Sequence, residues 1–181
     1  MSFPEVLRSR IFEPLGMSST SFSAPDTARL ATAYIPTPEG LQVWDPPGGQ
    51  WSRPPAFPDG AAGLVSTADD LLAFGLMLAR GGAPVLSAAS VKEMTRDQLT
   101  AGQRAYVQVF SAGRSWALCQ SVVTEGPHAG SYGWDGGMGS SWLVDPAADL
   151  VVIVLSQRLF ESPQPPLVHR ELQAAAYEAL A

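Results

Sequence analysis

The hydrophobic repeat of this chain changes from helical to strand-like part-way along, and that change restricts the folds open to it. Between Leu71 and Leu78, apolar side chains recur three and four positions apart, directly after the acidic residues of a helix start. After Gly102 the spacing becomes that of strands, and a last helix follows a proline pair at positions 165 and 166. Helices followed by an antiparallel meander and a closing helix predict an α+β fold, with an antiparallel β-sheet flanked by helices.

The second half of the chain supplies most of the predicted elements. We expect helices over residues 66–79 and from Ser87 to about residue 98. We expect strands over residues 105–110, 116–123, 140–145 and 150–157, the last two joined as a hairpin by residues 146–149. The closing helix should turn its apolar face inward, namely Val168, Leu172, Ala175 and Ala179. The chain thus divides into a helical and loop part, about 1–100, and a sheet part, about 101–181, of one unit.

The first sixty residues are harder to assign. Ser2 and Glu5 have the spacing of a capping box and predict a short amphipathic helix that ends before Pro14. Residues 28–34 could add one helical turn. Prolines then recur so often that we expect residues 35–60 to form a long ordered loop without a regular element.

Composition excludes several classes of function. Seventeen acidic residues against eleven basic ones give a net charge of −6, so neither nucleic acid nor an anionic membrane is expected as a partner. No stretch approaches the roughly 18 apolar residues of a membrane-spanning helix, and the first residues lack the regions of a secretion signal.

His128 and His169 lie far apart without clustered acids, so we expect no metal and no cofactor. Cys119, within an apolar stretch, is expected to be a small buried residue without a function.

A glycine-rich segment lies at the entrance to the strongest strand. Residues 133–139 contain four glycines, and an apolar strand of about six residues follows them. Glycine at such a position lets a ligand or another backbone approach closely. A binding wall and a simple twisted strand start or bulge are about equally compatible with this pattern.

Three motifs, taken together, resemble one known family. RIFEPLGM at residues 10–17 with STSF at 19–22 is similar to its "IFEPLGM…TSF" stretch, and AGLVSTADDL at 62–71 is similar to its "GGLVSTAxDL" helix start. WDG at 134–136 occupies the place of its third catalytic motif, Lys-Thr-Gly, whose first residue is His or Trp in esterase-like members. The chain therefore resembles the C-terminal part of the serine β-lactamase and penicillin-binding-protein superfamily, in its class C-like, esterase-related branch. The resemblance implies the C-terminal portion of the β-lactamase/transpeptidase-like fold.

The resemblance also implies acyl transfer at a serine. In that chemistry a Ser nucleophile attacks an ester or amide carbonyl, a Lys and a Tyr manage its proton, and water hydrolyses the acyl-enzyme. A backbone N–H of the third-motif strand helps to hold the oxyanion, and by position that donor is Gly137. Trp134, Asp135 and Gly136 are the implied substrate-binding residues.

Two residues of the third motif depart from the β-lactamase pattern. The family's lysine would hold a substrate carboxylate, whereas Trp134 offers an indole donor and an apolar face. Asp135 replaces a hydroxyl residue with a carboxylate, which would repel anionic substrates or else point away and make a structural hydrogen bond. The substitutions favour an esterase-like activity over a β-lactamase or carboxypeptidase activity.

The nucleophile of that chemistry is missing from these residues. Lys92 is the one lysine, and Ala89 stands three residues before it, so there is no Ser-x-x-Lys; no tyrosine begins a Tyr-x-Asn or Tyr-x-Ser motif. In family members both motifs precede the "IFEPLGM" region, which predicts that this chain is a C-terminal fragment, catalytically incomplete alone. Without the family's N-terminal segment, an unpaired sheet edge and apolar surface should be exposed, and the chain should self-associate. A small ester or amide is the expected substrate once the missing half is present.

Two other functions remain open at this point. Ser131 lies in a degenerate nucleophile elbow, and Asp145 and His169 follow it in the order of an α/β-hydrolase triad, although no helix is expected after Ser131. The chain could instead be a non-catalytic binding or partner module that keeps a cleft wall without turnover.

Overall fold

The structure, a computed structural model, describes residues 1–106 and 113–180. Its helical segments are α1 (Phe3–Leu7), the π-helical η1 (Arg8–Phe12), α2 (Glu13–Leu15), the 3₁₀ turns η2 (Thr27–Arg29) and η3 (Gln50–Ser52), α3 (Ala68–Ala79), α4 (Ala88–Thr95), α5 (Ala101–Tyr106) and α6 (Leu167–Glu178). Its strands are β1 (Ala33–Thr37), β2 (Gly40–Asp45), β3 (Arg114–Trp116), β4 (Ser121–Val123), β5 (Tyr132–Gly136), β6 (Ser140–Asp145) and β7 (Leu150–Leu155).

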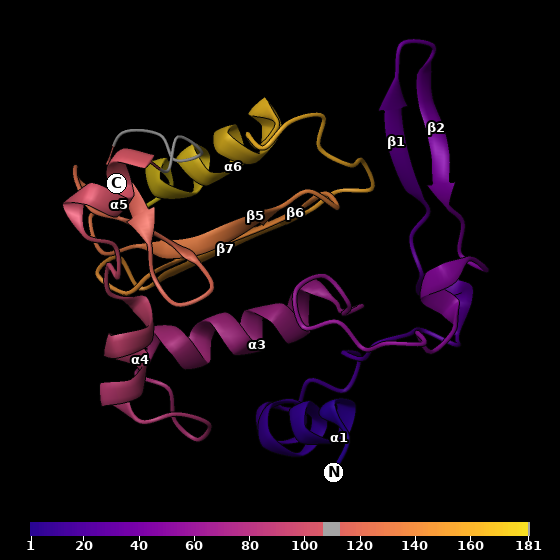
Figure 1. The fold of residues 1–181 in the computed structure, drawn as a ribbon, viewed down its shortest axis with the longest axis horizontal. Coiled ribbons are helices and arrows are strands. Elements are labelled where there is room, and N and C mark those ends of the chain that lie inside the picture. The colour runs from indigo at the N-terminus through magenta and orange to yellow at the C-terminus, as the bar shows by residue number, and fades with distance from the viewer. Residues whose placement is uncertain (107–112, 181) are drawn as a thin grey trace.

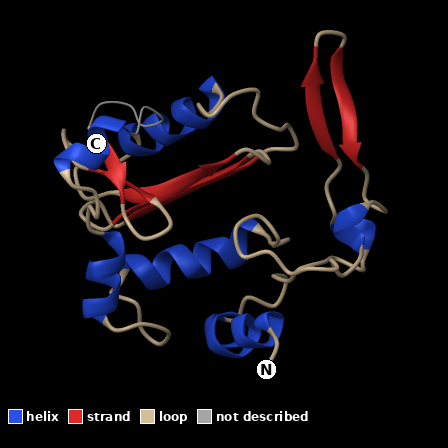
Figure 2. Cartoon of the chain, in the orientation of Figure 1, coloured by secondary structure: helices blue, strands red, loops and turns tan. Residues whose placement is uncertain are grey.

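A five-stranded antiparallel sheet forms the centre of the fold. Its strands lie in chain order, β3-β4-β5-β6-β7, so each pairs with the strand before it. Figure 1 shows α6 across one face of this sheet and α3 across the other, and Figure 2 shows the same layers by element type. The predicted α+β fold, with an antiparallel sheet flanked by helices, is confirmed.

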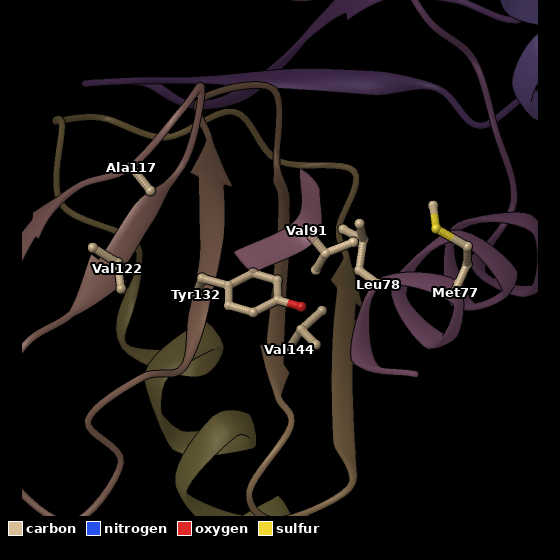
Figure 3. Packing of buried hydrophobic residues seen from close by; sticks show 7 residues of the cluster. All are labelled: Met77, Leu78, Val91, Ala117, Val122, Tyr132 and Val144. Atoms are coloured by element: carbon tan, nitrogen blue, oxygen red, sulfur yellow. The ribbon is translucent and has the colours of Figure 1, made fainter. Parts of the chain in front are cut away.

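The core lies between α3, α4 and the face of the sheet opposite α6. Tyr132, buried to 2% exposure, places its ring among apolar side chains of both layers (Figure 3). The cluster consists of Met77, Leu78, Val91, Ala117, Val122, Tyr132 and Val144. Gly75 lets α3 approach the sheet closely, because a Cβ there would lie 2.8 Å from a methyl group of Val151. The predicted helix stripe between Leu71 and Leu78 therefore faces the sheet as expected.

A buried carboxylate joins the two N-terminal motifs. Asp70, in the first turn of α3, accepts hydrogen bonds from the Ser19 amide at 2.8 Å and from the Thr20 hydroxyl at 2.7 Å. Thr20 Oγ1 also lies 2.7 Å from Ser66 Oγ, and Ser21 forms an antiparallel bridge with Val65. The segments that resemble family motifs at 10–22 and 62–71 are thus held side by side by the Asp70 carboxylate, the Thr20–Ser66 contact and the Ser21–Val65 bridge.

The first sixty residues differ most from expectation. The capping box of Ser2 and Glu5 is present, but the helical path continues through Pro14 to Gly16. The π-helical turn η1 precedes Pro14, and the Glu13 amide donates to the Arg8 carbonyl oxygen, five residues back. Residues 33–45 form the β1–β2 hairpin, so the expected loop over residues 35–60 is wrong for its first part. Pro36 fits this ribbon because a two-stranded sheet consists of edge strands, which tolerate a missing donor.

The stretch before β5 also needs correction. The predicted single strand over residues 116–123 is the hairpin of β3 and β4, with Cys119 at the turn. Cys119 has a φ of 62° and is exposed, so its expected burial is wrong. The predicted strand over residues 105–110 begins within helix α5, and its remaining residues lie outside the described part of the chain.

Helix α6 presents the sheet with a different face from the one expected, rotated by roughly one residue, about 100°. His169 is fully buried, and Gln173 and Tyr177 are half-buried. The predicted inner face is exposed, with Val168 at 50% and Leu172 at 47%. Ser141 and Asp145 on the sheet contact His169 and Tyr177 on the polar side of the helix, so the apolar stripe of α6 remains at the surface.

Replacing Asp70 tests the junction of the two motifs. Asp70→Ala would leave the Ser19 amide and the Thr20 hydroxyl without their acceptor, and we expect it to lower the free energy of unfolding by roughly 3 kcal/mol. The neighbouring exposed Asp69→Ala should cost about 0.5 kcal/mol, the value of a first-turn charge. Urea unfolding of both variants measures the difference, and equal losses would contradict this role of Asp70.

Candidate active site

The third motif lies on β5 and on the tight turn that follows it. Strand β5 pairs with β6 from Tyr132 opposite Val144 to Gly136 opposite Ser140. The three-residue loop between the strands is closed by a 3.0 Å hydrogen bond from the Gly139 amide to the Gly136 carbonyl oxygen. Gly139 has a φ of +99°, the left-handed position of such a loop, where a side chain is strained. The glycine pattern of the sequence therefore encodes a hairpin turn.

Residues 156–160 hold this turn from behind. The Ser156 amide and hydroxyl donate to the Gly139 carbonyl oxygen at 2.8 Å and 2.9 Å, and the Phe160 amide donates to the Gly137 carbonyl oxygen at 2.8 Å. A Cβ on Gly139 would lie 2.7 Å from the carbonyl oxygens of Ser156 and Arg158. The turn therefore has backbone contacts on one side that fix its position, a support that no pattern in residues 156–160 indicated.

Gly137 lies on the open side of the turn. The residue is exposed, and a Cβ added to it would have no neighbour within 4 Å. Its carbonyl oxygen accepts from the Phe160 amide, and the Gly136 carbonyl oxygen, in the peptide unit that carries the Gly137 N–H, accepts from the Gly139 amide, so both peptide units have a fixed orientation. An oxyanion donor needs a rigid backbone position that a substrate can reach, and Gly137 combines both properties.

Trp134 and Asp135 point to opposite faces of the sheet, as neighbours on a strand do. The Trp134 ring is 42% exposed and packs edge-on against the Trp116 ring, with centroids 4.9 Å apart. The Asp135 carboxylate lies 4.0 Å from the Arg114 guanidinium, on the face that α6 covers. Burial raises the pKa of the Asp135 carboxyl, and Arg114 opposes that rise. The sequence left open whether Asp135 would face an anionic substrate or point away from it. The structure shows the second arrangement, with the carboxylate beside Arg114 under α6.

A buried serine and histidine lie beside Asp135 under α6. Ser141 Oγ and His169 Nδ1 are 2.8 Å apart, and both residues are at most 1% exposed. Burial lowers the pKa of the His169 imidazole, and the charge of Asp135 acts in the opposite direction. The Nε2 atom of His169 has no hydrogen-bond partner within residues 1–106 and 113–180. This pair anchors α6 to β6 and is closed to substrate.

The structure does not assemble the α/β-hydrolase triad. Ser131 is 1% exposed and precedes strand β5, whereas a nucleophile elbow joins a strand to a helix. Asp145 accepts the Tyr177 hydroxyl at 2.9 Å and the amides of the β6–β7 turn, while His169 contacts Ser141 instead. His128 stacks on the Tyr177 ring at 3.7 Å, away from the glycine turn. The triad interpretation of Ser131, Asp145 and His169 is therefore wrong.

A cavity of about 680 Å³ opens beside the glycine turn. Met138 and Ser140 from the turn and from β6 form one wall, and Leu64, Ser66 and residues near the start of β1 form another. Its volume falls within the usual range for small-molecule sites, about 300–1,000 Å³. Among the described residues, no group of three or more His, Cys, Asp or Glu side chains could hold a metal ion, and no helix could cross a membrane.

Comparison with known proteins identifies the family. The profile of the Beta-lactamase family matches residues 1–177. The chain belongs to the Beta-lactamase family. Within it, the chain is 36% identical over 171 residues to Protein Rv1367c of Mycobacterium tuberculosis, covering 84% of this chain and 43% of that protein. It is 29% identical over 175 residues to Esterase EstB of Burkholderia gladioli, covering 87% and 44%. The chain thus spans less than half the length of these relatives.

Solved structures of other proteins share the fold. EstCE1, described as a hydrolase with promiscuous acyltransferase activity, superposes with a TM-score of 0.81 at 26% identity over 96% of this chain and 50% of its own. Simvastatin synthase of Aspergillus terreus gives 0.78 at 21% identity, over 99% and 50%, a likeness of fold. The resemblance to serine β-lactamases and penicillin-binding proteins that the three motifs indicated is confirmed.

The buried His169 makes stability depend on pH. Its pKa is lowered in the folded state, so the unfolded chain binds more protons as pH falls through about 6.5, the ordinary His value. We therefore expect the free energy of unfolding to fall between pH 8 and pH 5.5, and to fall less in His169→Gln. Unfolding in urea at the two pH values measures this slope. A slope unchanged in His169→Gln would contradict the assignment.

Proposed function

We propose that this chain forms one half of the cleft of an esterase-like serine hydrolase, in which Gly137 donates its backbone N–H to the oxyanion. One observation carries the proposal: the Gly137 turn is held from behind by residues 156–160 and is open toward a cavity of ligand size. The resemblance implies an oxyanion donor directly after the third motif, which is where this turn lies. Trp134 and Gly136 then line the substrate beside that donor.

The chemistry we propose needs a nucleophile from outside these 181 residues. A serine from a Ser-x-x-Lys segment, on the same or another polypeptide, attacks the ester carbonyl carbon while its proton passes to the lysine or tyrosine base. The carbonyl oxygen becomes an oxyanion and accepts the Gly137 N–H, an interaction typically worth about 10²–10³ in rate. The alcohol leaves with a proton, and water then hydrolyses the acyl-enzyme and restores the serine.

An ester is preferred to a β-lactam because the site strand lacks a cation. Trp134 stands where a lysine would hold a substrate carboxylate, and its half-exposed ring offers an apolar surface beside Trp116. The similarity to proteins named as an esterase and as a hydrolase with acyltransferase activity supports the same choice.

Removing one backbone donor tests the proposed role of Gly137. The chain is combined with a polypeptide that carries Ser-x-x-Lys and Tyr-x-Asn, from a neighbouring reading frame, and serine labelling by a fluorophosphonate is timed. Gly137→Pro removes the N–H at the second position of a turn, where proline is favoured, and we expect labelling to slow about 100-fold. Gly137→Ala keeps the N–H in open space and should label like the wild type.

Two results of that experiment would overturn the proposal. Equal labelling of the Gly137→Pro and Gly137→Ala proteins would remove Gly137 from the mechanism. Absence of labelling with every such segment, together with absence of a suitable reading frame, would favour the non-catalytic binding module instead.

We also propose that the chain self-associates when it is made alone. Strand β7, with the sequence LVVIVL, is an edge of the sheet, and Val168 and Leu172 form an exposed apolar stripe on α6. Unpaired edges and apolar surface of this kind promote pairing between chains.

Sedimentation tests this association directly. We expect the wild-type chain to show a weight-average mass that rises with concentration. Leu172→Glu places a charge in the stripe and should raise the dissociation constant of the association at least about threefold. Leu41→Glu, at an equally exposed apolar residue of the β1–β2 hairpin, should behave like the wild type. A wild-type chain that is monomeric at all concentrations would refute self-association.

A further inference from the structure

The cavity beside the glycine turn has a lining that selects among substrates. It is bounded by residues 18–33, by residues 62–67 with Trp51, and by the ends of β6 and β7. Met138 is the direct neighbour of Gly137 and lines this cavity, so a group bound there lies next to the proposed oxyanion donor. We propose that this cavity receives the acyl chain of the substrate and that the chain is uncharged and largely apolar. This inference rests on the proposed serine-hydrolase function.

Apolar side chains from separate segments supply the contact surface. Leu64, Met138 and Leu155 line the cavity and are 42%, 36% and 49% exposed, respectively. Trp51, from the 3₁₀ turn η3, adds an aromatic side chain. Large apolar side chains left open to solvent in a concave site gain free energy when an apolar ligand covers them.

Charge is nearly absent from the same walls. Among the described residues that line the cavity, the ionisable ones are Asp26 and Arg29, which carry opposite charges and lie three residues apart. The Asp26 carboxylate accepts the Ala28 amide at 3.0 Å as the cap of its turn. Most other polar lining residues are serines and threonines, whose hydroxyls cannot neutralise a buried carboxylate.

The site strand adds no charge either. Asp135 is the carboxylate of the third motif, and it faces α6, where it meets Arg114 and lies outside this cavity. Trp134 brings an indole in place of a cation. Within the described cavity lining, a substrate carboxylate would meet one cation, Arg29, together with the like charge of Asp26, so it would lose hydration without net neutralisation.

Binding to the chain as it stands tests the inference without turnover. The chain is labelled with ¹³C at the methionine methyl groups and titrated with octanamide and with 7-carbamoylheptanoate, which has the same length and ends in a carboxylate. We expect octanamide to shift the Met138 methyl signal saturably, while Met17 and Met77, buried elsewhere, stay in place. The carboxylate analogue should bind at least about tenfold more weakly, because its charge would lose hydration beside lining residues whose own charges, Asp26 and Arg29, cancel.

Variants locate the binding in the cavity. Leu155→Glu should weaken octanamide binding at least about tenfold, and Leu64→Glu, on the opposite wall, is a second variant should the first unfold. Leu41→Glu, outside the cavity, should bind octanamide like the wild type. Thermal unfolding of each variant confirms that it is folded.

Each contrary outcome has a definite meaning. No shift of Met138, or unchanged binding in both Leu155→Glu and Leu64→Glu, would remove the acyl chain from the cavity. Tighter binding of 7-carbamoylheptanoate that is lost in Arg29→Gln would show that the cavity selects an anion, which is the opposite of the inference. Because these measurements need no nucleophile, octanamide can bind as described while fluorophosphonate labelling fails, and the failure of each idea is visible separately.

Discussion

The backbone of residues 156–160 is hydrogen-bonded on both sides, and the remainder of the site depends on that arrangement. On one side, the amides of Phe160 and Ser156 donate to the carbonyl oxygens of Gly137 and Gly139 in the glycine turn. On the other, the Tyr34 amide donates to the Gln157 carbonyl oxygen at 2.7 Å, and the Leu159 amide donates to the Tyr34 carbonyl oxygen at 2.8 Å. One short segment therefore sets the position of the candidate oxyanion donor and of the β1–β2 hairpin. Because each bond involves backbone atoms, a change of side chain alters this arrangement little unless it disturbs the chain path.

The buried carboxylate of Asp70 has a comparable role at the other wall of the cavity. It fixes residues 18–21 against the start of α3, and both segments contribute lining residues. The cavity walls thus come from parts of the chain that are far apart in sequence but are joined by specific polar contacts. A site built in this way is pre-organised, because its walls are fixed before a ligand binds.

Elements with a strong period were predictable from sequence, and those defined by partners were not. The apolar run of β6 and the stripe of α3 follow from local pattern, since each buries one face against the core. The β1–β2 hairpin was missed because Pro36 and its neighbours argue against a strand unless the pairing partner is known. The inner face of α6 was predicted about one residue out of register, because the polar pair of Ser141 and His169 outweighs apolar periodicity there. At the site, the order of the motifs indicated Gly137 as a candidate, which stays a prediction, whereas the opposite orientations of Trp134 and Asp135 needed coordinates.

The exposed apolar face of α6 also matters outside the site. Its exposed Val168 and Leu172 form the type of surface that chaperones and proteases recognise in incompletely assembled proteins. A chain carrying such a surface has a cellular lifetime set by how quickly the surface is covered. Covering the helix would then lengthen that lifetime, and at a given rate of synthesis the amount of protein would rise with it.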